Sequence, residues 1–174
     1  MSEPPTWTCA SCGDVHSGLV TVFGPEAPDA WVMASDEERA GGELHLDTCV
    51  LPLGDQTHHF LRGQLDIPVH DADVGVFTWS VWVSLSAESW GATVEHWDDP
   101  DRAALPPMFG WLSTSLSPYD QPTNPLATHV HTRPPGLAPF IEVDPSLDHP
   151  LAREQVAGIS LHRVAELNSL ILGG

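Results

Sequence analysis

The chain contains no lysine, and six arginines stand against 24 Asp and Glu residues in a length of 174. Without lysine there is no Schiff-base nucleophile and no P-loop lysine for nucleotide phosphates. The formal net charge of −18 leaves no basic patch large enough to neutralise a run of phosphates. These absences argue against binding to nucleic acid or to an anionic membrane surface, and the acidity favours a self-repelling protein.

Long hydrophobic runs are also missing. None approaches the roughly 18 residues of a transmembrane helix, and the N-terminal segment lacks the pattern of a secretion signal. We therefore expect a cytoplasmic protein, in which three cysteines favour metal binding or thiol chemistry over a disulfide framework. The GxSxG, HExxH, GxGxxG, Walker and EF-hand patterns are absent as well, so the reactions typical of those motifs gain no support.

The residues that are present favour a folded core. The hydrophobic share is 41%, with seven Trp and five Phe, and the scattered 17 Pro and 14 Gly divide the chain into short elements without a linker or repeat. We predict one α+β domain over residues 1–174, in which a mainly antiparallel sheet has helices packed on one face. Residues 1–24 are expected to form a zinc-knuckle-like hairpin that is part of this domain.

Local signals place the elements. A hairpin is expected over residues 6–23, with its turn at Cys9–Gly13 and its return strand at residues 19–23. Ser35 and Glu38 have the spacing of a capping box for a helix over residues 36–40, and Ser86 is expected to cap a helix reaching residue 97. Asp148 and Ser160 are expected to cap two C-terminal helices. Strands are predicted at residues 44–53, 58–69, 75–85, 108–115, 127–133 and 139–143.

The two strands at residues 44–53 and 58–69 predict a hairpin. If residue 53 faces residue 58, one face becomes apolar and the other polar. On the polar face Cys49 then lies opposite Arg62, and His45 and Asp47 share that face. The apolar face pairs Val50 with Leu61, Leu46 with Leu65 and Leu44 with Ile67. In the strand at residues 75–85, Phe77, Trp79, Val81, Val83 and Leu85 are expected to face the core.

Short blocks follow one another along nearly the whole chain. They are Cys9-x-x-Cys12-Gly13-x-x-His16, Asp47-x-Cys49, Phe60-x-Arg62-Gly63, Asp66-Ile67-Pro68-Val69, Trp82-Val83-Ser84-Leu85-Ser86, Phe109-Gly110-Trp111-Leu112, His131-x-Arg133-Pro134 and His149-Pro150-Leu151-Ala152-x-Glu154-Gln155. This succession resembles the DUF2199 family of prokaryotic proteins of unknown function. The resemblance implies a shared architecture and gives weight to these positions, but it implies no activity.

The Cys9-x-x-Cys12 pair has the spacing at which two thiolates on a tight turn bind one tetrahedral zinc ion. A closed structural site needs four ligands, and His16 and Cys49 complete a Cys3His set. Such a zinc ion fastens the N-terminal hairpin, which has few large apolar groups, to the sheet.

The identity of the fourth zinc ligand stays open. His45 and Asp47 project from the same predicted strand face as Cys49, so either can replace His16. The alternative to a metal site is a pair of reduced thiols at Cys9 and Cys12, or a redox pair.

A second group of candidate residues is suited to an anion. His131 and Arg133 lie on one face of a predicted strand together with His129, and Arg62, another of the chain's six cations, joins them if the fold brings these residues together. We predict a small anionic ligand, a carboxylate or phosphate, for Arg62, His131 and Arg133, although a solvent face of a strand also carries such residues without any function.

Three functions remain open from the sequence. The first is a small zinc-binding protein with a binding or regulatory role. The second is an enzyme, a hydrolase or thiol redox protein, that uses Cys49 or a histidine as its reactive group while Arg62 and Arg133 hold an anionic substrate. The third is an acidic immunity or antitoxin-like protein that binds a basic protein partner.

Overall fold

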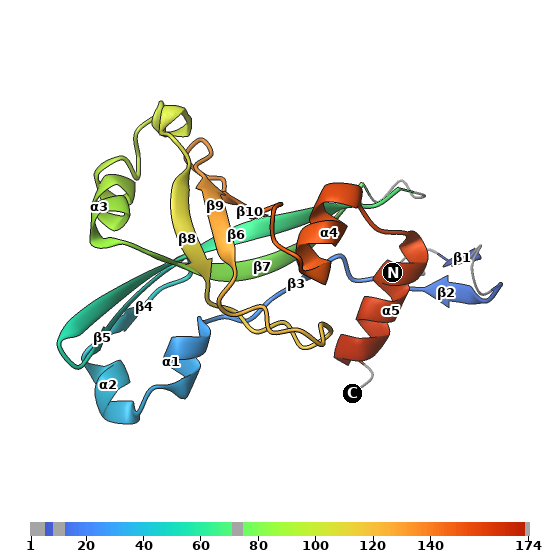
Figure 1. Cartoon of the computed structure of the whole chain (residues 1–174), viewed down its shortest axis with the longest axis horizontal. Coiled ribbons are helices and arrows are strands. Elements are labelled where there is room, and N and C mark those ends of the chain that lie inside the picture. The colour runs from blue at the N-terminus through green and yellow to red at the C-terminus, as the bar shows by residue number, and fades with distance from the viewer. Residues whose placement is uncertain (1–5, 9–12, 71–74, 173–174) are drawn as a thin grey trace, which may run out of the picture.

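The computed structural model describes residues 6–8, 13–70 and 75–172 of the chain. At its centre, five strands close into a mixed barrel (Figure 1). They are β6 (Gln56–Pro68), β7 (Val76–Leu85), β8 (Met108–Leu112), β9 (Ala127–His131) and β10 (Phe140–Val143). Neighbouring strands pair antiparallel except at the closure, where Phe140 of β10 pairs in parallel with Gln64 of β6.

Three short strands extend the barrel into an eight-stranded sheet. β3 (Val22–Phe23) pairs in parallel with β7. β5 (Thr48–Leu53) pairs with the first half of β6, and β4 (Glu43–Leu44) pairs with β5. A separate hairpin joins β1 (Thr6–Thr8) to β2 (Val15–Ser17), so the predicted N-terminal hairpin is present but its return strand comes earlier than residues 19–23.

The helices surround the barrel at separate places and do not form one layer. They are α1 (Asp29–Met33), α2 (Asp36–Ala40), α3 (Ala87–Glu95), the 3₁₀ helix η1 (Arg102–Ala104), α4 (Pro150–Ala157) and α5 (Leu161–Leu172). Helices α1 and α2 lie near β5, α3 lies near β8, and α4 and α5 lie at the opposite end of the molecule (Figure 1).

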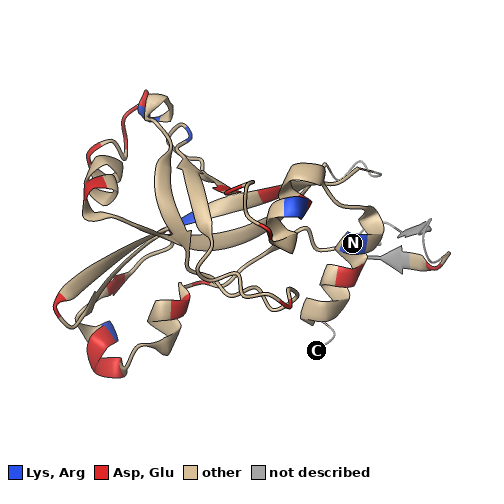
Figure 2. Ribbon diagram, in the orientation of Figure 1, with Lys and Arg blue, Asp and Glu red and all other residues tan. Residues whose placement is uncertain are grey.

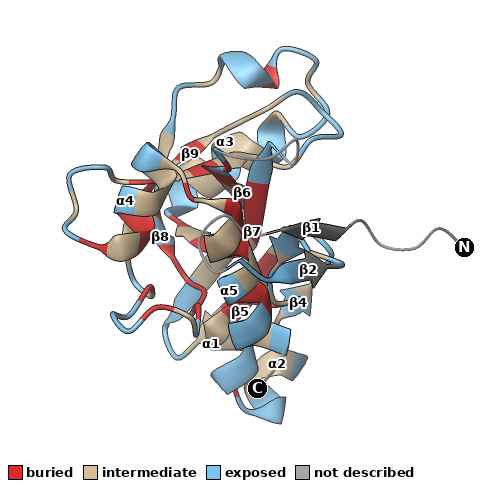
Figure 3. Cartoon of the chain, turned by 90° about the vertical axis from the view of Figure 1, so that its right-hand side faces the viewer, coloured by how far each residue is buried: buried red, intermediate tan, exposed pale blue. Residues whose placement is uncertain are grey.

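The predicted sheet with helices packed on one face is therefore wrong, because the sheet closes on itself. Alternation of apolar residues identifies the core face of a strand, but it carries no information on whether β6 meets β10, which is distant in the sequence. Buried residues lie on β6 and β7 in the middle of the molecule (Figure 3), and the predicted core face of β7 is confirmed. Its residues Phe77, Trp79, Val81, Val83 and Leu85 are all buried in the main core cluster.

A second apolar cluster lies on the outer side of the sheet. Trp82 lies on the face of β7 opposite the predicted core face, and it is fully buried there with Phe60 of β6 and Cys49 of β5. Ala30 and Trp31 of α1 pack against this cluster, so α1 supplies the cover that the sequence pattern of the strands did not reveal.

The register between β5 and β6 differs from the predicted one by two residues. Leu53 pairs with Gln56 across a tight turn in which Gly54 has a φ of +62°, a conformation that glycine adopts without strain. Cys49 consequently lies opposite Phe60 and not opposite Arg62.

Helix α4 fastens the closure of the barrel. The Gln155 side chain accepts a hydrogen bond from the Val143 amide at 2.8 Å and donates to the Ile141 carbonyl at 2.9 Å, both on β10. It also donates to the Asp66 carbonyl of β6 at 3.3 Å. One side chain thus links the two strands beyond their single backbone pair.

The helix caps agree with the sequence in part. Ser35 with Glu38 forms the predicted capping box, and Ser86 caps α3. At α4, however, the cap is His149 and not the predicted Asp148: its Nδ1 accepts a hydrogen bond from the Leu151 amide at 3.0 Å.

Candidate functional site

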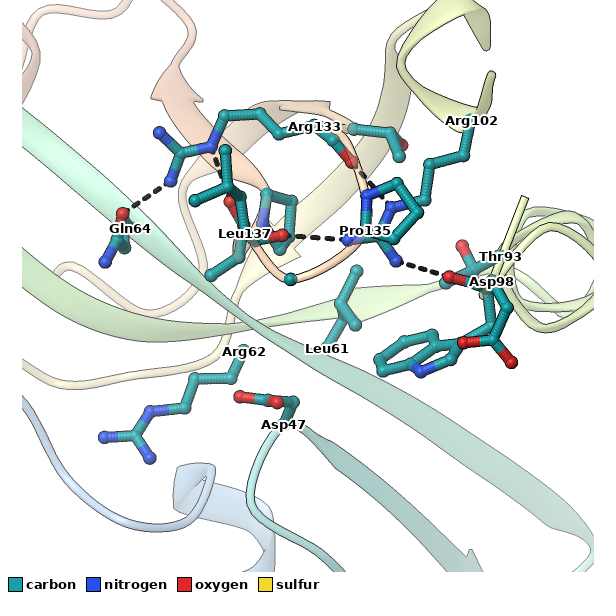
Figure 4. Close-up of a pocket in the computed structure, with 15 residues that line it drawn as sticks. Asp47, Leu61, Arg62, Gln64, Thr93, Asp98, Arg102, Arg133, Pro135 and Leu137 are labelled. Atoms are coloured by element: carbon teal, nitrogen blue, oxygen red, sulfur yellow. Dashed lines mark hydrogen bonds between the residues drawn. The ribbon is translucent and has the colours of Figure 1, made fainter. Parts of the chain in front are cut away.

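A cavity of about 410 Å³ opens beside β6, at the point where two strands share one of its edges (Figure 4). β5 pairs with the first half of this edge and β10 with the second. The Arg62 amide donates to the Asp47 carbonyl and the Gln64 amide to the Pro139 carbonyl, each at 2.9 Å. The two partner strands diverge at this place, and residues 132–139 and the segment after α3 complete the cavity wall.

Arg133 lies in the loop between β9 and β10 and is fixed by two neutral partners (Figure 4). Its Nε donates to the Ala138 carbonyl at 2.6 Å, and its Nη2 donates to Oε1 of Gln64 at 2.5 Å. Arg133 Nη1 and Gln64 Nε2 make no hydrogen bond to any described residue. The site therefore holds two neighbouring hydrogen-bond donors, one of them charged, in fixed positions.

Arg102 is a buried cation, 9% exposed, that holds the cavity wall together. Its guanidinium donates to the backbone carbonyls of Arg133 at 2.6 Å, Leu137 at 2.9 Å and Pro134 at 3.1 Å. A fourth bond, at 2.7 Å, goes to the Trp97 carbonyl, and the guanidinium lies 5.6 Å from the centre of the Trp97 ring. Arg102 thus joins the β9–β10 loop to the segment after α3.

Arg62 lines the cavity from β6, but its guanidinium points away from Arg133 (Figure 4). Its Nε donates to the Ser80 hydroxyl at 2.8 Å and its Nη1 to the Leu46 carbonyl at 3.4 Å. It also lies 6.0 Å from the centre of the Trp82 ring. The two predicted arginines therefore share one cavity without converging on one point.

None of these three arginines forms an ion pair with a carboxylate of the described residues. The other three arginines of the chain all do: Arg39 with Asp36, Arg153 with Asp148, and Arg163 with Glu154 and Glu166. Acidic residues are spread over the whole molecule, whereas basic residues are few (Figure 2). Cations with neutral partners are consequently concentrated in the cavity.

Two carboxylates also line the cavity. Asp47 lies next to β5 on the side of Arg62, and Asp98 follows α3 on the side away from Gln64 (Figure 4). Neither side chain has a hydrogen-bond or ion-pair partner among the described residues. The cavity is therefore lined by three arginines and two carboxylates, with Arg133 and Asp98 on different sides of it (Figure 4).

His131, predicted to join the two arginines, lies elsewhere. It projects from β9 on the outside of the barrel, where its Nε2 is 3.4 Å from Oε1 of Glu142 and its ring is 5.9 Å from that of Phe140. It does not line the cavity. The structure thus brings together Arg62 and Arg133 of the predicted anion site and leaves His131 in a surface pair with a carboxylate.

Cys49 is fully buried in the apolar cluster beside Trp82. Burial raises the pKa of its thiol from 9.0 to about 11, so the thiolate is scarce at neutral pH. A nucleophilic cysteine needs an accessible thiol with a lowered pKa. The hypothesis of an enzyme that uses Cys49 as its nucleophile therefore gains no support from this geometry.

The predicted zinc ligands are described only in part. Cys9 and Cys12 lie outside the described residues. His16 belongs to β2 and Cys49 to β5. Within the described residues, no group of three or more His, Cys, Asp or Glu side chains is suited to hold a metal. Zinc binding by Cys9 and Cys12 stays a prediction.

Arg102 and Gln64 are the cavity residues that the sequence reasoning missed. Arg102 follows Asp98, Asp99 and Asp101, so its neighbours in the sequence indicate a surface ion pair and not a buried cation. Gln64 alternates with apolar residues on β6, and only the path of the β9–β10 loop gives it a partner. No local signal distinguishes either residue.

Among the described residues, no helix combines the length and the apolar character that crossing a membrane requires.

Comparison with known proteins identifies the family of the chain. No curated protein and no solved structure matches the chain. The model of a family described as an uncharacterised protein conserved in bacteria matches residues 8–159, which is most of the chain. The protein thus belongs to the DUF2199 family.

Proposed function

We propose that the protein binds a small anionic ligand, such as a carboxylate or phosphate, in the cavity beside β6. One observation carries this proposal: three of the six arginines line a single cavity, and none of them pairs with a carboxylate of the described residues. In a chain with 24 acidic residues, such an arrangement leaves positive charge available for a ligand.

The ligand contacts follow from the unpaired donors. Arg133 Nη1 and Gln64 Nε2 lie on side chains that are already joined to each other, and both can donate to the oxygens of one anion. Because the Ala138 carbonyl and Gln64 hold the guanidinium in place, little side-chain entropy is lost on binding. Arg62, whose guanidinium points elsewhere, contributes its charge at longer range.

Calorimetric titration with sodium acetate and with inorganic phosphate at low ionic strength tests the proposal. We expect saturable binding of at least one of these anions and, for Arg133→Gln, an affinity lower by at least about 10-fold, since a charge-assisted hydrogen bond contributes about 1.5–3 kcal/mol. Arg62→Gln should weaken binding less.

Arg153→Gln is the matched control, because it removes the same charge from an exposed arginine outside the cavity. Its affinity for the anion should equal that of the wild type. Equal losses in the Arg133 and Arg153 variants would mean that only the net charge matters, and absence of binding to the wild-type protein would reject the proposed function.

Zinc binding by the N-terminal segment is our second proposal, and its support is the spacing of Cys9-x-x-Cys12 next to His16. A cytoplasmic location goes with it, because reduced thiols persist there. Metal analysis of protein purified without chelator should give about one zinc per chain, a value that Cys12→Ser lowers. Cys49→Ser should keep the zinc, since Cys49 is buried in the apolar cluster. Zinc-free wild-type protein would end this proposal.

A further inference from the structure

The cavity is much larger than an inorganic oxyanion. Its volume of about 410 Å³ lies within the range of about 300–1,000 Å³ that is usual for pockets that hold organic ligands. At about 30 Å³ per water molecule, an inorganic ion bound at Arg133 leaves most of this space to solvent. The size of the cavity therefore points to a ligand with a body as well as a charged group.

Part of the wall is apolar and exposed to solvent. Trp97 and Leu137 line the cavity, and they are 37% and 53% exposed. The backbone of each is held by a hydrogen bond from Arg102 to its carbonyl. Fixed apolar surface beside a charged group is the arrangement that binds the apolar part of an organic ligand.

The two carboxylates restrict the charge of that ligand. Asp98 lines the cavity on the Trp97 side and Asp47 lines it near Arg62, and neither has a partner among the described residues. A second negative group on the ligand would approach one of these carboxylates. The charge pattern therefore favours a single anionic group, bound on the Arg133 side (Figure 4).

We infer that the ligand is an organic monocarboxylate with an apolar body, its carboxylate on Arg133 and Gln64 and its body against Trp97 and Leu137. This inference rests on the proposed function, because it assigns the ligand class to the same cavity. It makes the apolar wall, and not the arginines alone, the source of selectivity.

Three small probes separate the contributions. Acetate carries the charged group alone, phenylacetate adds a ring to the same group, and 2-phenylethylamine keeps the ring but reverses the charge. By calorimetry with the full-length wild-type protein, we expect phenylacetate to bind at least about 10-fold more tightly than acetate, because the ring buries apolar surface. The amine should bind more weakly than phenylacetate by a similar factor.

Two variants locate the ring. Trp97→Ala and Leu137→Ser keep the backbone carbonyls that Arg102 needs, and each should lower the affinity for phenylacetate more than the affinity for acetate, so that the preference for phenylacetate falls. Trp111→Ala, which removes an exposed tryptophan outside the cavity, is the control and should keep the preference. If Trp97→Ala fails to fold, Leu137→Ser carries the test.

The possible results distinguish the two proposals. Equal affinities for acetate and phenylacetate would overturn the inference and leave anion binding intact, and so would a preference that neither cavity variant reduces. If neither acetate, phosphate nor phenylacetate binds, the proposed function fails and the inference fails with it.

Discussion

The six arginines form two sets that have the same side chain but different partners. Arg39, Arg153 and Arg163 lie on α-helices and pair with acidic residues, as expected for a protein with so much negative charge. Arg62, Arg102 and Arg133 line the cavity and bond to carbonyls, a hydroxyl and an amide. An excess of acidic residues therefore does not by itself neutralise every cation, because the fold decides which carboxylates are within reach.

Within the cavity set the roles also differ. Arg102 uses its guanidinium to connect backbone segments, whereas Arg133 keeps an unpaired amino group beside Gln64. The first is a structural cation and the second is available to a ligand. Substitutions at Arg102, Cys49, Arg163 and Arg153 test this division.

Arg102→Met should have the largest effect on stability. The change leaves four backbone carbonyls without their charged donor, and we expect the free energy of unfolding to fall by at least about 3 kcal/mol. Urea titration measures it. Arg153→Met is the control with the same side-chain change at an exposed ion pair. Similar losses in both variants would mean that Arg102 does not hold the cavity wall.

A substitution of Cys49 tests whether the second apolar cluster, which also contains Phe60 and Trp82, is core or a reactive site. Because the folded pKa, about 11, is raised above the unfolded value of 9.0, the neutral thiol stabilises the fold fully below pH 9 and this contribution is lost as pH rises toward 11. A shift of this size corresponds to roughly 2–3 kcal/mol. In urea titrations, the free energy of unfolding should decline less between pH 8 and pH 11 for Cys49→Ala than for the wild type. Equal declines would mean that the thiol is exposed to solvent.

Arg163→Gln should have an intermediate effect. Arg163 bonds Glu154 at 3.0 Å, and both side chains are mostly shielded from solvent, with the Tyr119 ring 5.7 Å from the guanidinium. The change leaves a partly buried carboxylate without its cation, which we expect to cost about 1–3 kcal/mol of unfolding free energy. If the additional change Glu154→Gln does not restore part of this loss, the ion pair is not its cause.

Arg153→Gln should have the smallest effect, below about 0.5 kcal/mol, because its pair with Asp148 is exposed and screened by water. In urea titrations at high salt, the difference in unfolding free energy between Arg153→Gln and the wild type should be smaller still, because salt screens the exposed ion pair. A loss comparable to that of the Arg102 variant would remove the distinction between the two sets.

Short-range signals predicted much of the local structure. Strict alternation identified the core face of β7, and capping residues located α2 and α3. The predicted register of β5 and β6 is wrong because Gly54 and Asp55 form a usual two-residue turn between Leu53 and Gln56. That signal is present in the sequence and corrects the position of Cys49.

The barrel and the cavity could not be predicted in the same way. Closure depends on one parallel pair, Phe140 with Gln64, and on Gln155, whose hydrogen bonds join distant segments. The sequence selected Arg62 and Arg133 as anion ligands because of their charge, and the fold places both in one cavity. The sequence pattern also selected His131, by its alternation with Arg133 along a strand. Alternation shows which face of a strand a residue lies on, but not what covers that face.

The most direct test follows the arginine Nε–H signals by nuclear magnetic resonance during titration with phenylacetate, each signal assigned with a single Arg→Gln variant. We expect the Arg133 signal to shift in a saturable way, the Arg62 signal to shift less, and those of Arg39, Arg153 and Arg163 to stay in place. An unmoved Arg133 signal, or equal shifts of all six, would contradict anion binding in this cavity.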